Sequence, residues 1–105
     1  MVKHIILWRL KETANGRSKA ENAQIIKEKL EARMGVTPGL LKVEVGIDIG
    51  IEPTSGMSWR GEDVSDMMFY SEWESREALT AYMTNPASHI VREFRTERRV
   101  VDWET

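Results

Sequence analysis

The sequence predicts an α+β domain in which two helices cover one side of an antiparallel sheet. Stretches with apolar residues at every second position, typical of strands, alternate with stretches that have a helical period. The order of these stretches is strand, helix, strand, strand, helix, strand. A chain of 105 residues supports one modest core. We therefore expect a single domain over residues 1–105.

The first strand, VKHIILWRL over residues 2–10, is apolar on both of its sides. Successive side chains of a strand point to opposite faces. One face receives Val2, His4, Ile6, Trp8 and Leu10, and the other receives Ile5 and Leu7. A titratable imidazole therefore lies within an otherwise apolar strand face.

The segment SKAENAQIIKEKLEARMG, residues 18–35, changes to a helical period. Its apolar residues lie about one turn apart: Ala23, Ile26, Leu30 and Met34. Ser18 followed by Glu21 predicts a capping box at the start, and Gly35 suits the C-terminal cap.

The run LLKVEVGIDI, residues 40–49, alternates as a half-exposed strand does. Its two faces carry Leu41, Val43, Val45, Ile47 and Ile49 on one side and Lys42, Glu44 and Asp48 on the other. The following segment, IEPTSGMSWRGED over residues 51–63, is long for a connection in a compact domain. It predicts either a lid, closed by Met57 and Trp59, or a decorated hairpin.

The third strand lies within VSDMMFYSEW, residues 64–73. Alternation puts Met67, Phe69 and Trp73 on one face and Met68 and Tyr70 on the other. Ser75 is the expected cap of a helix over REALTAYMT, residues 76–84, which Pro86 ends. Asn85 can cap a short helix through Ile90, Val91 and Phe94, and RVVDW closes the chain as a strand.

This order of elements is that of a ferredoxin-like sheet with both helices on one face. The first and third strands nevertheless carry large apolar side chains on both faces. A few hundred Å² of apolar surface left in water would forgo several kcal/mol at ~25 cal/mol per Å². We therefore expect a homodimer that pairs through the uncovered sheet face.

Composition excludes several classes of function. The chain has no cysteine, which removes disulfides and thiolate chemistry, and its histidines lack metal-site spacing, so no metal and no cofactor are expected. The net charge is −2, and the basic residues Arg92, Arg95, Arg98 and Arg99 alternate with Glu93 and Glu97. We interpret that segment as a solvated helix face rather than a nucleic-acid site. No apolar run is long enough for a membrane helix or has the form of a signal peptide, so a cytoplasmic protein is expected.

Three segments, VKHIILWRLK, SEWESREALTAYMTNPASHIVREF and RRVVDWE, together resemble the stress-responsive A/B barrel (Dabb) family. The resemblance spans nearly the whole chain, in the same order. It implies a ferredoxin-like monomer that pairs through its sheet into a dimeric α+β barrel, in agreement with the two-sided strands. Many members of this family have no established activity.

One enzymatic branch of that family, the plant polyketide cyclases, implies a set of site residues. In that branch a first-strand histidine, a tyrosine late in the second helix and a histidine after the next proline line a pocket between sheet and helices. The matching residues are His4, Tyr82 and His89. The family often reads His-Pro-x-His, whereas this chain has one more residue between proline and histidine, which turns His89 by about a third of a helical turn.

His4 therefore has two interpretations. It is either a core histidine whose nitrogens are satisfied internally, or a neutral general base assisted by Tyr82 as hydrogen-bond donor and His89 as orienting group. Predicted pocket-lining residues are Ile6, Trp8, Ile26, Ile90 and Phe94. The leading functional hypothesis is binding of a small apolar or aromatic molecule; the alternatives are a cofactor-free cyclase or isomerase, and a non-catalytic dimeric interaction module.

Overall fold

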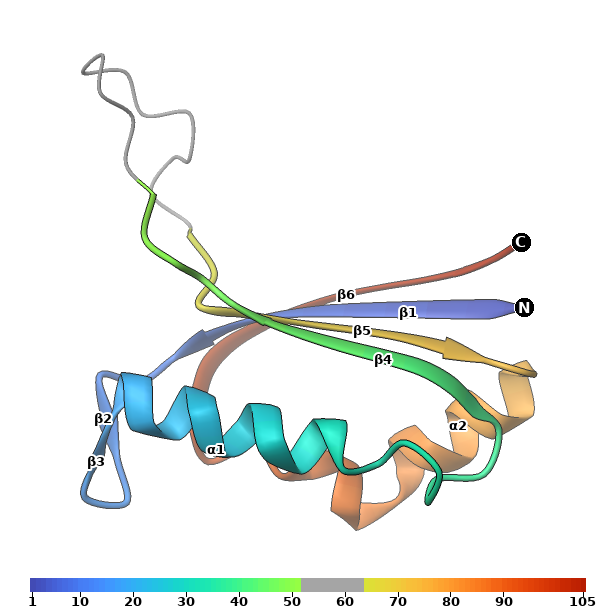
Figure 1. The fold of residues 1–105 in the computed structure, drawn as a ribbon, viewed down its shortest axis with the longest axis horizontal. Coiled ribbons are helices and arrows are strands. Elements are labelled where there is room, and N and C mark those ends of the chain that lie inside the picture. Colours follow the sequence, from blue (N-terminus) through green and yellow to red (C-terminus); the bar gives the residue numbers. More distant parts are fainter. Residues whose placement is uncertain (52–63) are drawn as a thin grey trace.

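A computed structural model describes residues 1–51 and 64–105. A four-stranded antiparallel sheet is formed in the order β4-β5-β1-β6 by β1 (Val2–Leu10), β4 (Leu40–Ile47), β5 (Met67–Trp73) and β6 (Arg95–Glu104). Helices α1 (Lys19–Glu31) and α2 (Arg76–Thr84) both lie on one side of the sheet (Figure 1). The predicted ferredoxin-like fold is confirmed. Met57 and Trp59, the predicted lid residues, lie outside the described residues.

A small hairpin before α1 was not predicted. It consists of β2 (Thr13–Ala14) and β3 (Arg17–Ser18), joined by Asn15 and Gly16, which both have positive φ angles, 53° and 73°. Consecutive left-handed residues are what a tight two-residue turn requires, and Asn-Gly is its preferred sequence. Buried Asn22 of α1 holds the hairpin: its Nδ2 donates to the Ala14 carbonyl at 3.1 Å.

Both helices begin as predicted, and α2 also ends as predicted, at Thr84, whereas α1 ends earlier. Ser18 and Glu21 form the capping box of α1, and the Ser75 hydroxyl accepts from the Ala78 N–H at the start of α2. Helix α1 ends at Glu31 with Ala32 as its cap, so Gly35 lies beyond it. After α2 only a 3-10 turn, η1 (Pro86–His89), is helical.

The segment from Pro86 to Phe94 is therefore not the short helix that was predicted after Asn85. Its backbone bonds run from Ser88 to Asn85, from Arg92 to His89 and from Phe94 to Val91. Each spans three residues, which is a tight turn rather than an α-helical step. The chain descends to β6 in successive turns and places Val91 and Phe94 in the core.

The helix-covered face of the sheet is the core. The five alternate residues of β1 from Val2 to Leu10 are all buried, and so are Met67, Phe69 and Trp73 of β5. In β4 the predicted alternation holds for Val43, Val45 and Ile47, which pack in or against this core. Leu41 is instead 46% exposed, because the pairing with β5 is irregular between Leu40 and Lys42.

The opposite face, here called the open face, is covered by no described element (Figure 1). Its central apolar side chains are half-buried or exposed: Ile5, Leu7, Met68, Tyr70, Val101 and Trp103. The rings of Tyr70 and Trp103 lie 6.2 Å apart. Charged side chains, among them Lys3 and Glu72, flank this apolar centre. Among residues 1–51 and 64–105, no helix is long and apolar enough to span a membrane.

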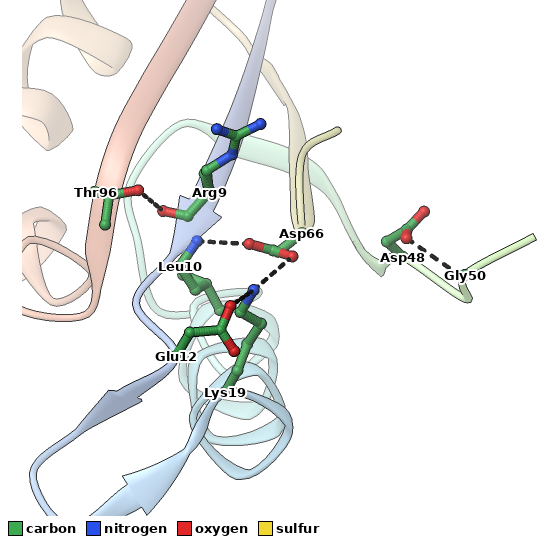
Figure 2. A network of polar contacts seen from close by, with 8 residues as sticks. All are labelled: Arg9, Leu10, Glu12, Lys19, Asp48, Gly50, Asp66 and Thr96. Atoms are coloured by element: carbon green, nitrogen blue, oxygen red, sulfur yellow. Dashed lines mark hydrogen bonds and ion pairs between the residues drawn. The ribbon is translucent and has the colours of Figure 1, made fainter. Parts of the chain in front are cut away.

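Asp66, just before β5, ties three segments of the chain together (Figure 2). Its Oδ2 accepts from the Leu10 N–H at 2.7 Å, and its Oδ1 accepts from Lys19 Nζ at 3.3 Å. Glu12 also pairs with Lys19, at 3.0 Å. Burial lowers the pKa of Lys19, but the bonds to Glu12 and Asp66 outweigh it and raise the pKa overall.

Replacement of Asp66 by alanine is expected to lower the free energy of unfolding by about 1–3 kcal/mol. The substitution leaves the Leu10 N–H without its acceptor and removes the charge-assisted hydrogen bond from Lys19. Glu12→Ala is the matched control. Its side chain is 88% exposed and touches the same lysine, so its loss is expected to cost at most ~1 kcal/mol. Urea unfolding of both variants compares them; equal losses would contradict this role of Asp66.

Candidate functional site

The centre of the candidate site is a hydrogen-bonded pair of side chains from two neighbouring strands. His4 of β1 lies opposite Asp102 of β6, and His4 Nδ1 is hydrogen-bonded to Asp102 Oδ1. An ionised carboxylate only accepts hydrogen bonds, so the imidazole proton lies on Nδ1. In the neutral ring, Nε2 is then the nitrogen without a proton.

His4 Nε2 is buried and, among the described residues, is the one buried side-chain polar atom without a hydrogen-bond partner. His4 itself is 0% exposed. An unpaired buried acceptor costs about 1–3 kcal/mol, and such atoms in native proteins call for an explanation. The interpretation of His4 as a core histidine with both nitrogens satisfied is therefore wrong: Nδ1 is satisfied and Nε2 is not.

The two members of the pair have very different environments. The His4 side chain is 1% exposed, whereas the Asp102 side chain is 50% exposed. Asp102 borders a groove of about 390 Å³ between α2 and the end of β6, beside the Arg76–Glu104 ion pair. The carboxylate thus connects the buried ring to the protein surface.

A second space, here called the inner cavity, lies between the sheet and the segment that follows α2. Tyr82 and His89 line it together with Ile6, Trp8 and Phe69. The two predicted residues from α2 and η1 therefore meet at one site, despite the additional residue before His89. The cavity volume is about 20 Å³, which is room for about one water molecule.

His4 lies behind the wall of the inner cavity rather than on it. Its ring contacts Phe69 edge-on, with the ring centroids 6.0 Å apart. Ile6, the next residue of β1 on this face, also lines the cavity. Phe69 in turn stacks on Trp8 at 6.0 Å. His4 therefore adjoins Ile6 and Phe69, which form this part of the cavity wall.

Not every residue predicted to line the pocket does so. Ile6 and Trp8 line the inner cavity, but the structure places Ile26 and Phe94 in the surrounding core and Ile90 against it. Helix α1 reaches the cavity one turn later, through Leu30 rather than Ile26.

Tyr82 is buried between the inner cavity and a groove beneath the loop that leads into β4. Its ring lies 5.1 Å from that of Trp73. Burial raises the pKa of the Tyr82 hydroxyl, and the charge of Arg33 opposes this only in part. The hydroxyl therefore stays protonated at neutral pH and is able to donate a hydrogen bond.

The raised pKa predicts the alkaline behaviour of the protein. A Tyr70→Phe variant leaves Tyr82 as the one tyrosine, because the chain has two. Its tyrosinate absorbance is expected to appear with a midpoint above the ~10 of a free tyrosine. The pKa of Tyr82 is higher in the folded than in the unfolded protein. The contribution of the protonated Tyr82 to the free energy of unfolding is therefore complete below the unfolded pKa, and it is lost as pH rises through the folded pKa. A midpoint at or below ~10 would contradict the buried environment.

The basic segment predicted to be a solvated helix face is not helical. Arg92 lies in the turns before β6, and Arg95 and Arg98 belong to β6. All three line the inner cavity. The periodicity of the segment misled the prediction, because in a strand every second residue, rather than every third or fourth, shares a face.

Asp102 is the site residue that reasoning from the sequence did not assign a role. A signal existed, since one carboxylate interrupts the apolar run VVDW, as one imidazole interrupts the run VKHIILW. Only the register of β1 with β6 brings the two together. In the described ranges, no group of three or more potential metal ligands gathers here or elsewhere.

A family model described as Stress Responsive A/B Barrel Domain (Dabb) matches residues 2–105. No curated protein matches. Among solved structures, a dimeric protein of unknown function with a ferredoxin-like fold from Bacteroides fragilis is 26% identical, with a TM-score of 0.74 and coverage of 99% of this chain and 95% of that one.

Two enzymes are also similar in structure. A hydroxynitrile lyase from Passiflora edulis is 18% identical, with a TM-score of 0.67 and coverage of 97% of this chain and 90% of that one. An antibiotic biosynthesis monooxygenase is 19% identical, with a TM-score of 0.61 and coverage of 100% and 98%. At these identities the likeness shows the fold alone, and the activity of this chain is undetermined.

Proposed function

Because the chain belongs to the stress-responsive A/B barrel (Dabb) family, we propose that it is a homodimer that binds a small apolar or aromatic molecule between sheet and helices, with His4 Nε2 as its hydrogen-bond acceptor. The observation that carries this proposal is the buried, unpartnered Nε2. A buried acceptor without a partner lowers the stability of the free protein. A ligand that donates a hydrogen bond to this acceptor removes that cost, which adds to the binding free energy. A cytoplasmic location remains a prediction.

The ligand must enlarge the inner cavity, because small-molecule sites usually measure ~300–1,000 Å³. The movable part of the wall is the start of the segment after α2, where Ser88 and His89 are only half-buried. Tyr82 and His89 remain the proposed donor and orienting group, and Ile6 and Trp8 the apolar floor. Ile26 and Phe94 belong to the core around this floor, and Ile90 packs against that core.

Dimerisation is proposed through the open face. Three similar solved structures are described as dimeric ferredoxin-like proteins. The open face has the composition of an interface, with an apolar centre and a charged rim. Because the helices cover the other face, pairing through the open face leaves the route to the inner cavity free in each subunit.

Thermal stabilisation tests the binding proposal. A screen of small aromatic and carbonyl compounds is expected to yield ligands that raise the melting temperature, since only molecules that prefer the native state do so. Bound ligands should shift the amide resonances of Ile6, Trp8 and His89. Hits that shift only resonances of the open face, or a screen without hits, would leave the dimeric interaction module as the function.

General-base chemistry is the second candidate function, and the Asp102 carboxylate on Nδ1 favours it. Binding alone needs no carboxylate there, whereas a base that takes up a proton at Nε2 becomes an imidazolium, which a carboxylate stabilises. Asp102, half exposed, also offers a path for the proton to leave. In this reaction Nε2 removes a proton next to a carbonyl group, and the Tyr82 hydroxyl donates to the developing enolate oxygen.

Deuterium exchange tests the second candidate directly. Acetophenone in D₂O is expected to lose its methyl protons about 10²–10⁴ times faster with the protein than with the Asp102→Asn variant or with buffer. Equal exchange rates for wild type and variant would reject base catalysis and leave binding intact.

A further inference from the structure

Three arginines converge on the inner cavity: Arg92, Arg95 and Arg98, here called the arginine cluster. Arg98 lies opposite Trp8 in the β1–β6 pairing, and Arg95 lies opposite Leu10. Both therefore extend from the helix-covered face of the sheet. Arg92 reaches the same place from the turn that precedes the strand.

The glutamates that alternate with these arginines in the sequence do not neutralise them. Glu97 lies opposite Arg9 and belongs to the other face of the sheet. Within residues 1–51 and 64–105, no aspartate or glutamate lines the inner cavity, and no acidic side chain forms an ion pair with the arginine cluster. Strand pairing has separated charges that the sequence interleaves.

This concentration of positive charge is unfavourable in the free protein. The chain as a whole carries a formal charge of −2, so the cluster opposes the overall sign. Burial lowers the pKa of Arg95, and the neighbouring charges of Arg98 and Arg92 lower it further. Repulsion of this kind is relieved by an anion held between the guanidinium groups, which bind carboxylate and phosphate oxygens in pairs.

We propose that the arginine cluster binds the anionic group of a small-molecule ligand whose apolar part enters the inner cavity. The inference rests on the proposed function and narrows it: the ligand is an aromatic or aliphatic carboxylate or phosphate. His89, which lines the same cavity, supplies a further hydrogen-bond donor. The apolar part lies against Ile6, Trp8 and Phe69, on the side of the cavity nearest His4.

Three naphthalene compounds that differ in charge test this inference: 2-naphthamide, 2-naphthoate and 2-naphthyl phosphate. Affinity is expected to rise about tenfold for each added charge, because each charge adds charge-assisted hydrogen bonds to the guanidinium groups. The gain should shrink as salt is added. A larger gain for the phosphate than for the carboxylate would identify a phosphorylated ligand; a gain that stops at the carboxylate would identify an acid.

Arg98→Gln is the test variant, since the residue is exposed and its replacement leaves the core intact. It is expected to lower the affinity for 2-naphthoate about tenfold and to leave that for 2-naphthamide unchanged. Lys29→Gln is the matched control. It also removes one positive charge, from an exposed position of α1 that does not line the inner cavity, and should bind like the wild type.

Inorganic phosphate separates this inference from the proposed function. It needs no opening of the inner cavity and is expected to shift the Nε–H resonances of Arg95 and Arg98. If phosphate does so but no naphthalene enters the cavity, the anion site stands and the proposed function falls. If the three naphthalenes bind equally well, or neither phosphate nor the naphthalenes bind, the anion site is overturned.

Discussion

Leu7→Glu is expected to convert the dimer into monomers. Leu7 is 37% exposed at the centre of the open face, and pairing through that face would bury it in both subunits. In a two-fold symmetric interface the substitution is present in both subunits, so its effect on the free energy of association is doubled. Each substitution forfeits about 0.5–1 kcal/mol of apolar burial, because only the exposed third of Leu7 remains to be buried. It also adds a carboxylate whose desolvation costs several kcal/mol, so association should weaken at least ~1,000-fold.

Sedimentation velocity at micromolar concentration measures this effect. Val36→Glu is the control: Val36 is more exposed, at 72%, but lies after α1, away from the sheet. It should remain dimeric and fold normally. A dimeric Leu7→Glu protein, or a wild type that sediments as a monomer, would show that the open face is not the interface.

His4→Leu is expected to abolish function without loss of stability. Leucine has a similar volume and removes the unpaired Nε2, and the half-exposed Asp102 can be solvated when its partner is gone. The free energy of unfolding should therefore equal or exceed that of the wild type, by up to ~2 kcal/mol. Ligand affinity should fall at least ~tenfold with loss of the acceptor, and deuterium exchange should fall to the background rate.

His4→Gln separates binding from catalysis, because the glutamine oxygen can accept a hydrogen bond but is no base. It should retain part of the affinity and none of the exchange activity. Urea unfolding, calorimetric titration with hits from the screen and proton NMR of acetophenone provide the three readouts. A His4→Leu protein that loses several kcal/mol of stability and still binds would make His4 a structural residue.

Much of the fold could be predicted because local signals agree with the final packing. The alternation in β1 and β5, the capping box at Ser18 and the cap at Ser75 are each readable within a few residues, and the structure confirms them. The hairpin at Asn15 was missed because strands of two residues are too short to show a period.

The candidate site could be predicted only in part, because it depends on contacts between distant segments. Tyr82 and His89 meet at the inner cavity as the resemblance implied. The partnership of His4 with Asp102 required the register of β1 with β6, and the arginine cluster required the knowledge that this segment is a strand. Neither follows from spacing along the chain.

The nitrogen NMR spectrum of the His4 ring tests most directly whether Nε2 is the hydrogen-bond acceptor for the ligand. It reports the proton and the hydrogen bonds of each ring nitrogen separately. In the free protein we expect the proton on Nδ1 and a bare Nε2. On addition of a compound that raises the melting temperature, the Nε2 resonance should shift as it accepts a hydrogen bond. A proton on Nε2 in the free protein, or a Nε2 resonance unmoved by every bound compound, would contradict the account.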